Sequence, residues 1–487
     1  MNPFTFLIIF LLYTMVLFGV SLITSRKSSN KAYFLGNRKS PWFVVAYGMV
    51  GASLSGVTFI SIPGWVGTSY FTYLMVVFGY LAGYLVITFV LLPLYYNLNL
   101  TSIYTFLNKR FGTYSHKSGA FFFIVSRLIG ASFRMFLVIN VLQLFIFDLL
   151  GVPFWISVLI FLGLITLYSF KGGIKTIVWT DMLQTTFMLV ALGITIMIIL
   201  QQTGYSLTEM IALTKEKGLT RIIESDWRHD RFFIKQFFSG MFITIVMTGL
   251  DQDMMQKNLS CKSLKDAQKN MITLSIILIP VNLIFLFLGA TLFVYAEQFH
   301  INIPALSDDL FPLLALKHFG FAAGIVFFIG LIAAAYSSAD SAITAITTSL
   351  SIDFFGIEDN KNLTENKQIK IRYLLHFFVT SLVFITIVLF RSINDQAVIA
   401  KLFTIAGYTY GPLLGLFAFG LFNKAKIYDR WVPLVVILSP VLSYLLSLYS
   451  ESLLWGYKFG FELLIVNGLI TYAGLLLLIN NTKIKNN

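Results

Sequence analysis

With 487 residues, 57% of them hydrophobic and 12% charged, and a mean hydropathy of +0.82, the chain is not an ordinary soluble domain and is expected to be an integral membrane protein. Its single cysteine, Cys261, excludes an internal disulfide and a cysteine-based metal site. The net charge of +13 does not predict nucleic-acid binding, because the basic residues form short clusters between apolar segments; the lipid bilayer is the expected partner.

Apolar segments recur along the whole chain, and thirteen of them are long enough to cross a bilayer at about 20 residues per crossing. The first is predicted to be a retained helix rather than a signal peptide, because no basic residue precedes it. The predicted spans cover residues 4–24, 42–69, 71–97, 117–148, 153–170, 176–200, 236–256, 269–297, 321–352, 371–391, 397–422, 431–449 and 461–480.

The distribution of Lys and Arg predicts the orientation of these spans. Basic residues are concentrated in the odd-numbered connections and in the C-terminal tail. Because cytoplasmic loops are enriched in Lys and Arg, the N-terminus is expected outside and the C-terminus in the cytoplasm, in a multi-pass protein of the plasma (inner) membrane. The long connection near residues 201–235 carries five acidic residues beside six basic ones, which predicts a folded external segment.

Two of the predicted spans contain polar and glycine-rich interruptions. The second span holds GASLSGVTFISIPG at residues 51–64, and the seventh holds TGLDQD at residues 248–253, five spans later. Broken helices at matching places in two halves of a chain are typical of inverted-repeat transporters, because an unwound backbone exposes carbonyls for a cation and N–H groups for a solute. The alternative is a pair of glycine kinks or small-residue packing seams.

Ionisable residues also lie within predicted spans, where they are functional candidates by default. Asp181 lies early in the sixth span and Asp340 in the ninth, and Arg127 and Arg134 lie in the fourth. The alternative for both aspartates is a structural ion pair with one of these arginines.

The segment AAAYSSADSA, residues 333–342, places several oxygen-bearing side chains on one helix. Ser337, Asp340 and Ser341 are spaced i, i+3, i+4 and therefore share a face, with Ser338 adjacent. Hydroxyls, carbonyls and a carboxylate are suitable ligands for a hard monovalent cation. The alternative for the serines is ordinary hydrogen bonding to their own helix.

Five stretches in chain order, GASLSG, GGIKTIVWTDMLQ, QKNLSCKSLKDAQK, AAAYSSADS and YGPLLGLFAFGLF, together resemble the sodium:solute symporter family over about residues 3–425. The resemblance implies an all-α integral membrane protein with the leucine-transporter-like fold, two inverted five-helix repeats within about 13 transmembrane helices. The implied organisation is an N-terminal helix and cytoplasmic loop (1–41), a first repeat (42–201), an extracellular loop (202–235), a second repeat (236–425), and two further helices with a tail (426–487).

The resemblance also implies ion sites, with Na⁺ as the bound ion, one or two per cycle. One Na⁺ would be held by the backbone carbonyls of Ala52, Ser55 and Ala334 and by the hydroxyls of Ser337 and Ser338. A second ion site, or a coupling role, is implied for Asp181, Asp340 and Ser341. Whether Asp340 holds a second Na⁺ or carries a proton is left open.

The solute site implied by the resemblance lies beside the sodium site. Arg134, in the stretch SFRMFL, resembles the carboxylate-binding arginine of sialic acid transporters in the family, which favours an anionic solute. The alternative is that Arg134 pairs with Asp251 or Asp181. The full candidate set is Thr58, Ser61, Phe78, Arg134, Asp251, Gln252, Tyr408 and Tyr410.

The resemblance therefore implies a secondary active transporter that couples Na⁺ entry to symport of a small polar or anionic solute, such as a sugar or an acidic sugar like sialic acid, by alternating access. The alternative is a proton-coupled carrier that uses Asp340 or Asp181. No enzyme activity is expected, because the sequence contains no HExxH, GxxxxGK[ST] or GxSxG motif. The expected partners are a small-molecule solute and the bilayer, with no nucleic acid and no obligate protein partner.

Overall fold

The computed structural model describes residues 3–25, 29–358, 360, 362–391 and 398–480, and these residues are almost entirely helical. Within them, eleven helices are long and apolar enough to cross a membrane, and a bent pair of helices forms a twelfth candidate. Each of the thirteen predicted spans coincides with one of these or, for the last, with a 15-residue apolar helix. That helix is about 22 Å long, which is short for a full crossing.

The helices that correspond to the predicted spans carry the following bounds: α1 (Pro3–Thr24), α3 (Trp42–Ser69), α4 (Tyr73–Val86) continued by α5 (Leu92–Asn97), α7 (Thr113–Leu142), α8 (Phe154–Gly172), α9 (Ile174–Thr203), α11 (Phe233–Thr244) with α12 (Gln252–Leu259), α13 (Leu264–Gln298), α15 (Phe321–Ser349), α16 (Glu365–Phe390), α17 (Val398–Phe422), α18 (Val432–Leu448) and α20 (Leu463–Leu477). Short helices lie in the connections, namely α2 (Asn30–Leu35), α6 (Thr105–Arg110), α10 (Leu207–Glu216), α14 (Leu310–Leu313) and α19 (Ser450–Leu453).

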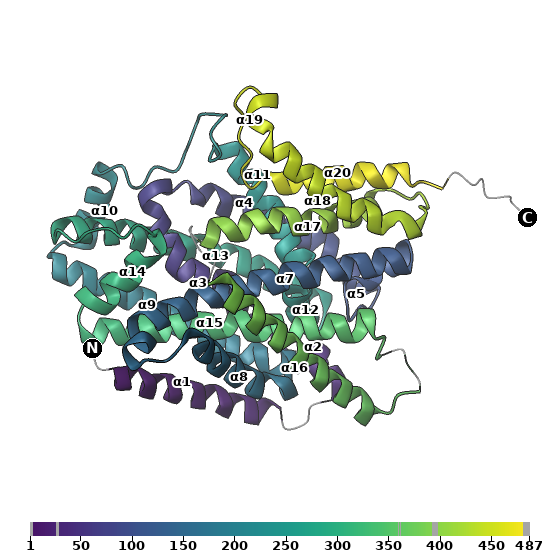
Figure 1. Ribbon diagram of the computed structural model, residues 1–487, viewed down its shortest axis with the longest axis horizontal. Coiled ribbons are helices and arrows are strands. Elements are labelled where there is room, and N and C mark those ends of the chain that lie inside the picture. Colours follow the sequence, from purple (N-terminus) through teal and green to yellow (C-terminus); the bar gives the residue numbers. More distant parts are fainter. Residues whose placement is uncertain (1–2, 26–28, 359, 361, 392–397, 481–487) are drawn as a thin grey trace, which may run out of the picture.

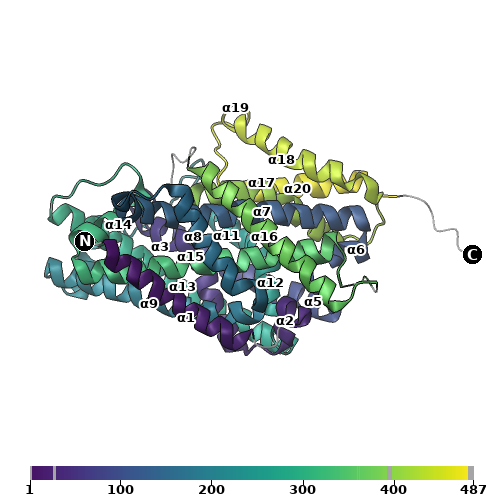
Figure 2. The same ribbon diagram turned by 60° about the horizontal axis from the view of Figure 1, so that its bottom comes forward.

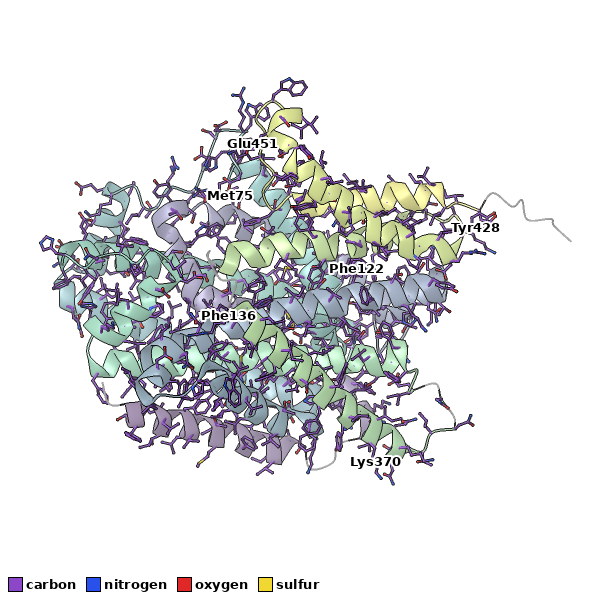
Figure 3. The ribbon with its side chains drawn as sticks, viewed as in Figure 1. Met75, Phe122, Phe136, Lys370, Tyr428 and Glu451 are labelled. Atoms are coloured by element: carbon purple, nitrogen blue, oxygen red, sulfur yellow. The ribbon has the colours of Figure 1, made fainter. Side chains whose placement is uncertain are left out.

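The helices run roughly along the long axis of the molecule, and α1 begins at the opposite end from the end of α20 (Figure 1). In both ribbon views α1 lies along one side of the bundle and α18 with α20 along the other (Figure 2). Helices α3, α9, α13 and α15 pack against one another in the interior. Side chains such as Phe122 and Phe136 fill the space along α7, whereas Lys370 and Tyr428 lie at the edge of the molecule (Figure 3).

Helix α3 is broken at Ser55, as predicted from the GASLSG stretch. Ser55 has φ 46° and ψ 178°, far from helical values, so the peptide units around it lose their helical hydrogen-bond partners. The glycines on either side allow close packing: a Cβ on Gly51 would overlap Thr185 of α9, and a Cβ on Gly56 would lie 2.5 Å from Val138 of α7. The break is therefore wedged between α7 and α9.

The second predicted break is also present, but its exposed carbonyls already have partners. Helix α11 ends in a π-helical turn at Ile245–Gly249, and α12 leaves at a bend of 64°. The hydroxyl of Tyr95 donates to the carbonyl of Gly249 at 2.8 Å, and that of Tyr104 donates to the carbonyl of Leu250 at 2.8 Å. The two breaks thus lie at matching positions, but they differ in their free backbone carbonyls, because those of Gly249 and Leu250 already accept hydrogen bonds from tyrosines.

Candidate functional site

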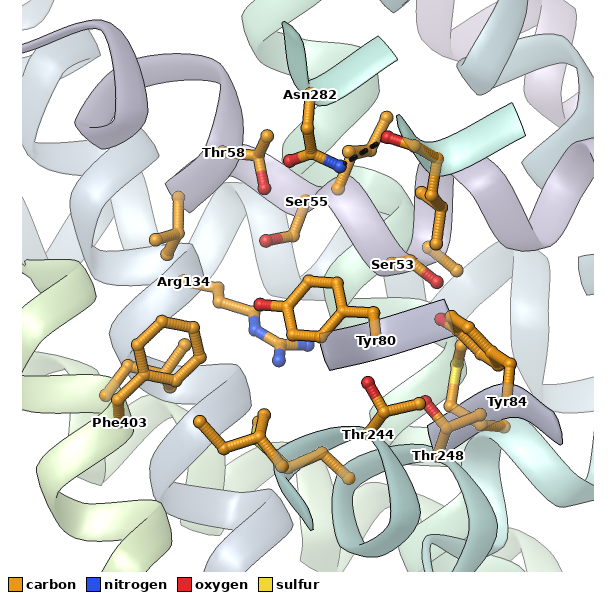
Figure 4. A pocket seen from close by; sticks show the side chains of 18 of the residues that line it. Ser53, Ser55, Thr58, Tyr80, Tyr84, Arg134, Thr244, Thr248, Asn282 and Phe403 are labelled. Atoms are coloured by element: carbon orange, nitrogen blue, oxygen red, sulfur yellow. Dashed lines mark hydrogen bonds between the residues drawn. The ribbon is translucent and has the colours of Figure 1, made fainter. Parts of the chain in front are cut away.

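A cavity of about 90 Å³ lies next to the break in α3. Hydroxyl, amide and guanidinium groups from five helices face it, among aliphatic and aromatic side chains, as Figure 4 shows. The lining residues include Ala52, Ser53, Ser55, Thr58, Tyr73, Tyr80, Tyr84, Arg127, Arg134, Thr244, Met247, Thr248, Asn282, Leu402 and Phe403.

Arg134, on α7, supplies the positive charge that reaches farthest into this cavity. Its side chain points to the middle of the lining residues, close to Tyr80 (Figure 4). The residue is 8% exposed, and its guanidinium forms neither an ion pair nor a hydrogen bond with any residue that the structure describes. The alternative pairing of Arg134 with Asp251 or Asp181 is therefore not found.

Arg127, which precedes Arg134 on α7 by about two helical turns, is bound by carboxylates instead. It forms a buried ion pair with Asp253, and its Nη1 lies 3.8 Å from Oδ2 of Asp251. Both aspartates belong to the start of α12, directly after the second break. Arg127 therefore fastens α12 to α7, while Arg134 stays available to the cavity.

The residues assigned to the first Na⁺ come from two helices that pack together, α3 and α15. Ala52 and Ser55 line the cavity at the α3 break. On α15, the Ser338 hydroxyl donates to the carbonyl of Ala334 at 3.0 Å, and the Ser337 hydroxyl donates to Oδ1 of Asp181 at 2.9 Å. All five residues are buried, and a serine oxygen that donates its proton still offers lone pairs to a cation.

Asp181 is bound by a lysine that follows directly after the predicted seventh span, residues 236–256. Nζ of Lys257, on α12, lies 2.8 Å from Oδ2 of Asp181 and 3.6 Å from Oδ1 of Asp253, and donates to Oγ of Ser341 at 3.0 Å. Lys257 is 1% exposed. The alternative pairing of Asp181 with Arg127 or Arg134 is thus not found, and Lys257 belongs to the interior rather than to a cytoplasmic connection.

Asp340 points to a different neighbour. Its Oδ2 accepts a hydrogen bond of 2.5 Å from the hydroxyl of Tyr168, on α8, and its Oδ1 accepts one of 2.6 Å from the backbone N–H of Ser341. No contact joins Asp340 to Asp181 or Lys257 among the hydrogen bonds and ion pairs of the described chain. The hydroxyl of Ser341 donates to Oδ1 of Asp340 at 3.3 Å and accepts from Lys257, so Ser341 connects Asp340 with the lysine that binds Asp181.

The predicted solute residues fall into two groups. Thr58 and Arg134 line the cavity. Tyr410 lines a small neighbouring pocket that Arg127 and Arg134 also line, and its hydroxyl donates to Asp251 at 2.6 Å. Asp251 caps α12 through Asp253 and Met254 and is fully buried. Tyr410 therefore lies beside the central cavity rather than in its lining, and Asp251 lies behind Tyr410.

Four predicted solute residues are not brought to the cavity. Phe78 lies on the outer side of α4 with 36% of its surface exposed, so the structure does not place it at this cavity. Gln252 is held by the backbone of Thr101 and Ile103. Ser61 is buried farther along α3, and Tyr408 lines a separate cavity of about 290 Å³ with Phe403.

Several lining residues were missed from the sequence. Tyr80 and Tyr84 lie on α4, Thr244 on α11 and Asn282 on α13. Only Asn282 gave a signal, because an amide in the middle of an apolar stretch is uncommon at membrane depth. The tyrosines and the threonine are ordinary in membrane helices, so nothing in the local pattern singled them out.

A model of the sodium:solute symporter family matches residues 33–426 of the chain. The sodium/sialic acid symporter SiaT of Proteus mirabilis is 24% identical over 430 residues, which cover 85% of this chain and 83% of that protein. The corresponding protein NanT of Aliivibrio fischeri is 23% identical, covering 83% and 80%. The human sodium/iodide cotransporter is 25% identical, covering 86% and 65%.

Solved structures share the fold. A Na⁺-coupled sialic acid symporter in a substrate-bound, outward-open state superposes with a TM-score of 0.85 at 20% identity, covering 97% of both chains. The transporter Mhp1, of the nucleobase-cation-symport-1 family, in a closed conformation gives a TM-score of 0.57 at 15% identity, covering 93% of this chain and 94% of its own. The chain is thus an all-α membrane protein with the expected leucine-transporter-like fold.

These relatives are transporters rather than enzymes, and the sialic acid symporters and the iodide cotransporter are named for sodium, the ion expected from the sequence. From the match over most of its length, and from the broken helices at the centre of its fold, the chain belongs to the sodium:solute symporter family.

Proposed function

We propose that the protein is a Na⁺-coupled symporter of a small organic anion, with an acidic sugar such as sialic acid as the first candidate solute. The observation that carries this proposal is the guanidinium of Arg134, which is buried at the cavity without an acidic partner among the described residues. An unpaired charge in a low-dielectric interior is unfavourable by several kcal/mol. A bound carboxylate offsets that penalty and accepts two parallel hydrogen bonds from the planar guanidinium.

The names of the relatives support an anionic solute. Besides the sialic acid symporters and the iodide cotransporter, they include the human sodium-coupled monocarboxylate transporter 2, which is 23% identical over 424 residues. Sialic acid, iodide and a monocarboxylate share little except a negative charge. A fixed cation in the cavity is the simplest feature that serves all of them.

The Na⁺ site is proposed at the break in α3, against α15. Backbone carbonyls released at Ser55, together with the hydroxyls of Ser337 and Ser338, provide the oxygen ligands that a hard cation requires. Na⁺ bound there joins the two helices and favours the conformation that binds solute. Each Na⁺ that moves down a 100 mV potential contributes about 2.3 kcal/mol, or about 50-fold accumulation of solute.

The path of the solute is proposed to pass Phe403. This residue lines both the central cavity of about 90 Å³ and the cavity of about 290 Å³ that Trp65, Arg231 and Tyr408 help to enclose. Pockets for drug-sized ligands measure about 300–1,000 Å³, so an acidic sugar requires the central cavity to widen. Movement of Phe403 would join the two spaces and admit the solute.

We further propose that residues 42–201 and 236–425 form the two repeats that move relative to each other during alternating access. The N-terminus is proposed to lie outside and the C-terminus in the cytoplasm of the plasma membrane. Helix α1 begins and α20 ends at opposite poles of the bundle, which supports placing the two ends of the helical bundle on opposite sides of the membrane (Figure 1). Lys257 is buried, and without it the basic residues of the connections still lie mostly on the predicted cytoplasmic side.

Coupling to protons through Asp340 or Asp181 is the weaker candidate. The relatives are named for sodium, and Asp181 is already bound to Lys257 at 2.8 Å. Asp340 is held by Tyr168 and does not line the cavity.

The experiment is a solute screen on purified protein, followed by uptake into proteoliposomes. Sialic acid, monocarboxylates, neutral sugars and amino acids are compared by thermal shift with and without Na⁺, using the wild type and Arg134→Met. We expect an acidic solute to stabilise the wild type only in Na⁺, and not to stabilise Arg134→Met. A neutral solute that stabilises both proteins equally would remove Arg134 from solute recognition.

A further inference from the structure

The oxygens that would hold a second cation in this chain are in contact with the ammonium group of Lys257. The residues assigned from the sequence to a second ion are Asp181, Asp340 and Ser341. Nζ of Lys257 contacts oxygens of two of them, Asp181 at 2.8 Å and Ser341 at 3.0 Å. Lys257 is 1% exposed and enters from α12, with Asp253 at 3.6 Å as its third oxygen neighbour. An ammonium carries one positive charge and binds oxygen acceptors only, as an alkali cation does. The donor set therefore does not fit a second Na⁺.

Buried charges of both signs surround this group. The connected ion pairs place the carboxylates of Asp181, Asp251 and Asp253 against the cations Lys257 and Arg127. Asp340 joins the same network through Ser341, whose hydroxyl donates to Oδ1 of Asp340 at 3.3 Å and accepts from Lys257 at 3.0 Å. A Na⁺ on the oxygens that Lys257 contacts would lie directly against the ammonium, so the two cations exclude each other there.

We propose that Lys257 is a tethered cation that replaces a second Na⁺, so that this chain couples one Na⁺ to each solute. The ammonium stays with the protein and adds nothing to the driving force. Its role is to hold α12 against α9 and α15 at all times. A second Na⁺ would hold these helices together only while it was bound. The inference rests on the proposed Na⁺ site at Ser337 and Ser338, which supplies the one ion that remains.

The position of Lys257 explains how this tether acts on the remaining ion. Asp181 accepts from Ser337 through Oδ1 and faces Lys257 through Oδ2, so one carboxylate connects the Na⁺ site with α12. Lys257 also lies within one helical turn of Asp253, which Arg127 binds. Loss of the ammonium leaves Asp181 as a free buried carboxylate beside Ser341, which is a suitable place for a cation.

The test counts bound Na⁺ directly and needs no knowledge of the solute. Purified protein is titrated with ²²Na⁺, and ions per chain and the Hill slope are measured for the wild type, Lys257→Met and Lys257→Arg. We expect one ion and a slope near 1 for the wild type and for Lys257→Arg, which keeps the charge. Lys257→Met should bind two ions with a slope above 1.

The double variant Lys257→Met with Asp181→Asn is the control, because it removes the ammonium and also the carboxylate that would bind a second Na⁺. The number of bound Na⁺ ions per chain should return to one. Two ions in the wild type would overturn the proposal, and so would one ion in a folded Lys257→Met protein. If Lys257→Met does not fold, the wild-type count decides alone. No bound Na⁺ in the wild type would instead defeat the proposed sodium-coupled function, so the two failures are distinguishable.

Discussion

The hydroxyl of Ser337 donates a hydrogen bond of 2.9 Å to the carboxylate of Asp181, and this contact connects the proposed Na⁺ site with the buried ion pairs of α12. Ser337 lies on α15 and Asp181 on α9. A cation bound by Ser337 would polarise its hydroxyl and strengthen the bond to Asp181. Na⁺ binding and the position of α12 are therefore linked through two side chains.

Ser338→Ala should raise the Na⁺ concentration required for half-maximal uptake by about five- to tenfold, because the loss of one neutral oxygen ligand weakens binding by about 1 to 1.4 kcal/mol. Uptake at varied Na⁺ in proteoliposomes measures this. Ser351→Ala is the matched control, since Ser351 is also buried, follows the same helix, and its hydroxyl has no described partner. Equal Na⁺ dependence of both variants would place the ion elsewhere.

The two arginines of α7 should respond in opposite ways to the same substitution. Arg127→Met leaves Asp253 and Asp251 without their cation and should destabilise the protein by about 3–5 kcal/mol, as for other broken buried ion pairs. Arg134→Met removes a charge without a described partner and should leave the melting temperature unchanged or raise it. Thermal unfolding in detergent measures both. A large loss of stability in Arg134→Met would indicate a structural role.

Gly51→Ala should destabilise the protein by about 1–3 kcal/mol, because the added Cβ overlaps Thr185 and separates α3 from α9. The same shift moves the break at Ser55, so Na⁺ affinity should fall as well. Gly193→Ala, on α9, is the control: no atom lies within 4 Å of its Cβ, and the helix should gain up to about 1 kcal/mol. Thermal unfolding with and without Na⁺ compares the two variants, and a stable Gly51→Ala protein would mean that α3 and α9 separate at little cost.

Cys261 should resist alkylation in the folded protein even at alkaline pH. It lies in the turn between α12 and α13, is fully buried, and burial raises the pKa of its thiol to about 12. Because only the thiolate reacts, labelling by a maleimide should stay slow as pH rises from 7 to 9, where an ordinary cysteine becomes largely ionised. The control is the same protein in denaturing detergent, and rapid labelling before denaturation would show that this turn opens.

Asp340→Asn should retain Na⁺-driven uptake. The carboxylate accepts hydrogen bonds from Tyr168 and from the backbone of Ser341, and it touches neither the cavity nor Lys257. Uptake measured against Na⁺ at several pH values tests this. If the variant loses its response to pH and keeps no response to Na⁺, Asp340 carries a coupling proton and the sodium-coupled proposal fails.

The sequence was sufficient for the fold because its signals are strong and local. Apolar segments of about 20 residues located the spans. Glycine beside serine located the break in α3, because the close packing at Gly51 and Gly56 and the positive φ of Ser55 fall within a few consecutive residues. The proposed ligands on α15 followed from the family resemblance, with which their helical spacing agrees. Arg134 was found because a charge within a span is rare enough to be noticed.

The partners of those residues could not be predicted, because they depend on how distant helices pack. Lys257 follows the predicted seventh span and precedes Lys262 and Lys265, a position that is typical of a loop, although the bend after Gly249 returns it to the interior. Phe78 was assigned to the cavity from its place in the chain, whereas the rotation of α4 directs Tyr80 and Tyr84 there instead. Successive residues of a helix are rotated by about 100° about its axis, and this rotation decides which side chains face the cavity. Hydropathy does not report the rotation, because both faces of such a helix are apolar.

The tyrosine contacts at the second break set a limit on how the molecule moves. Tyr95 and Tyr104, which flank the connection between α5 and α6, hold the carbonyls of Gly249 and Leu250, where α12 begins. A displacement of α12 alone would strip two buried carbonyls of their donors. A movement that preserves both hydrogen bonds therefore carries the segment that holds Lys257 together with the connection between α5 and α6.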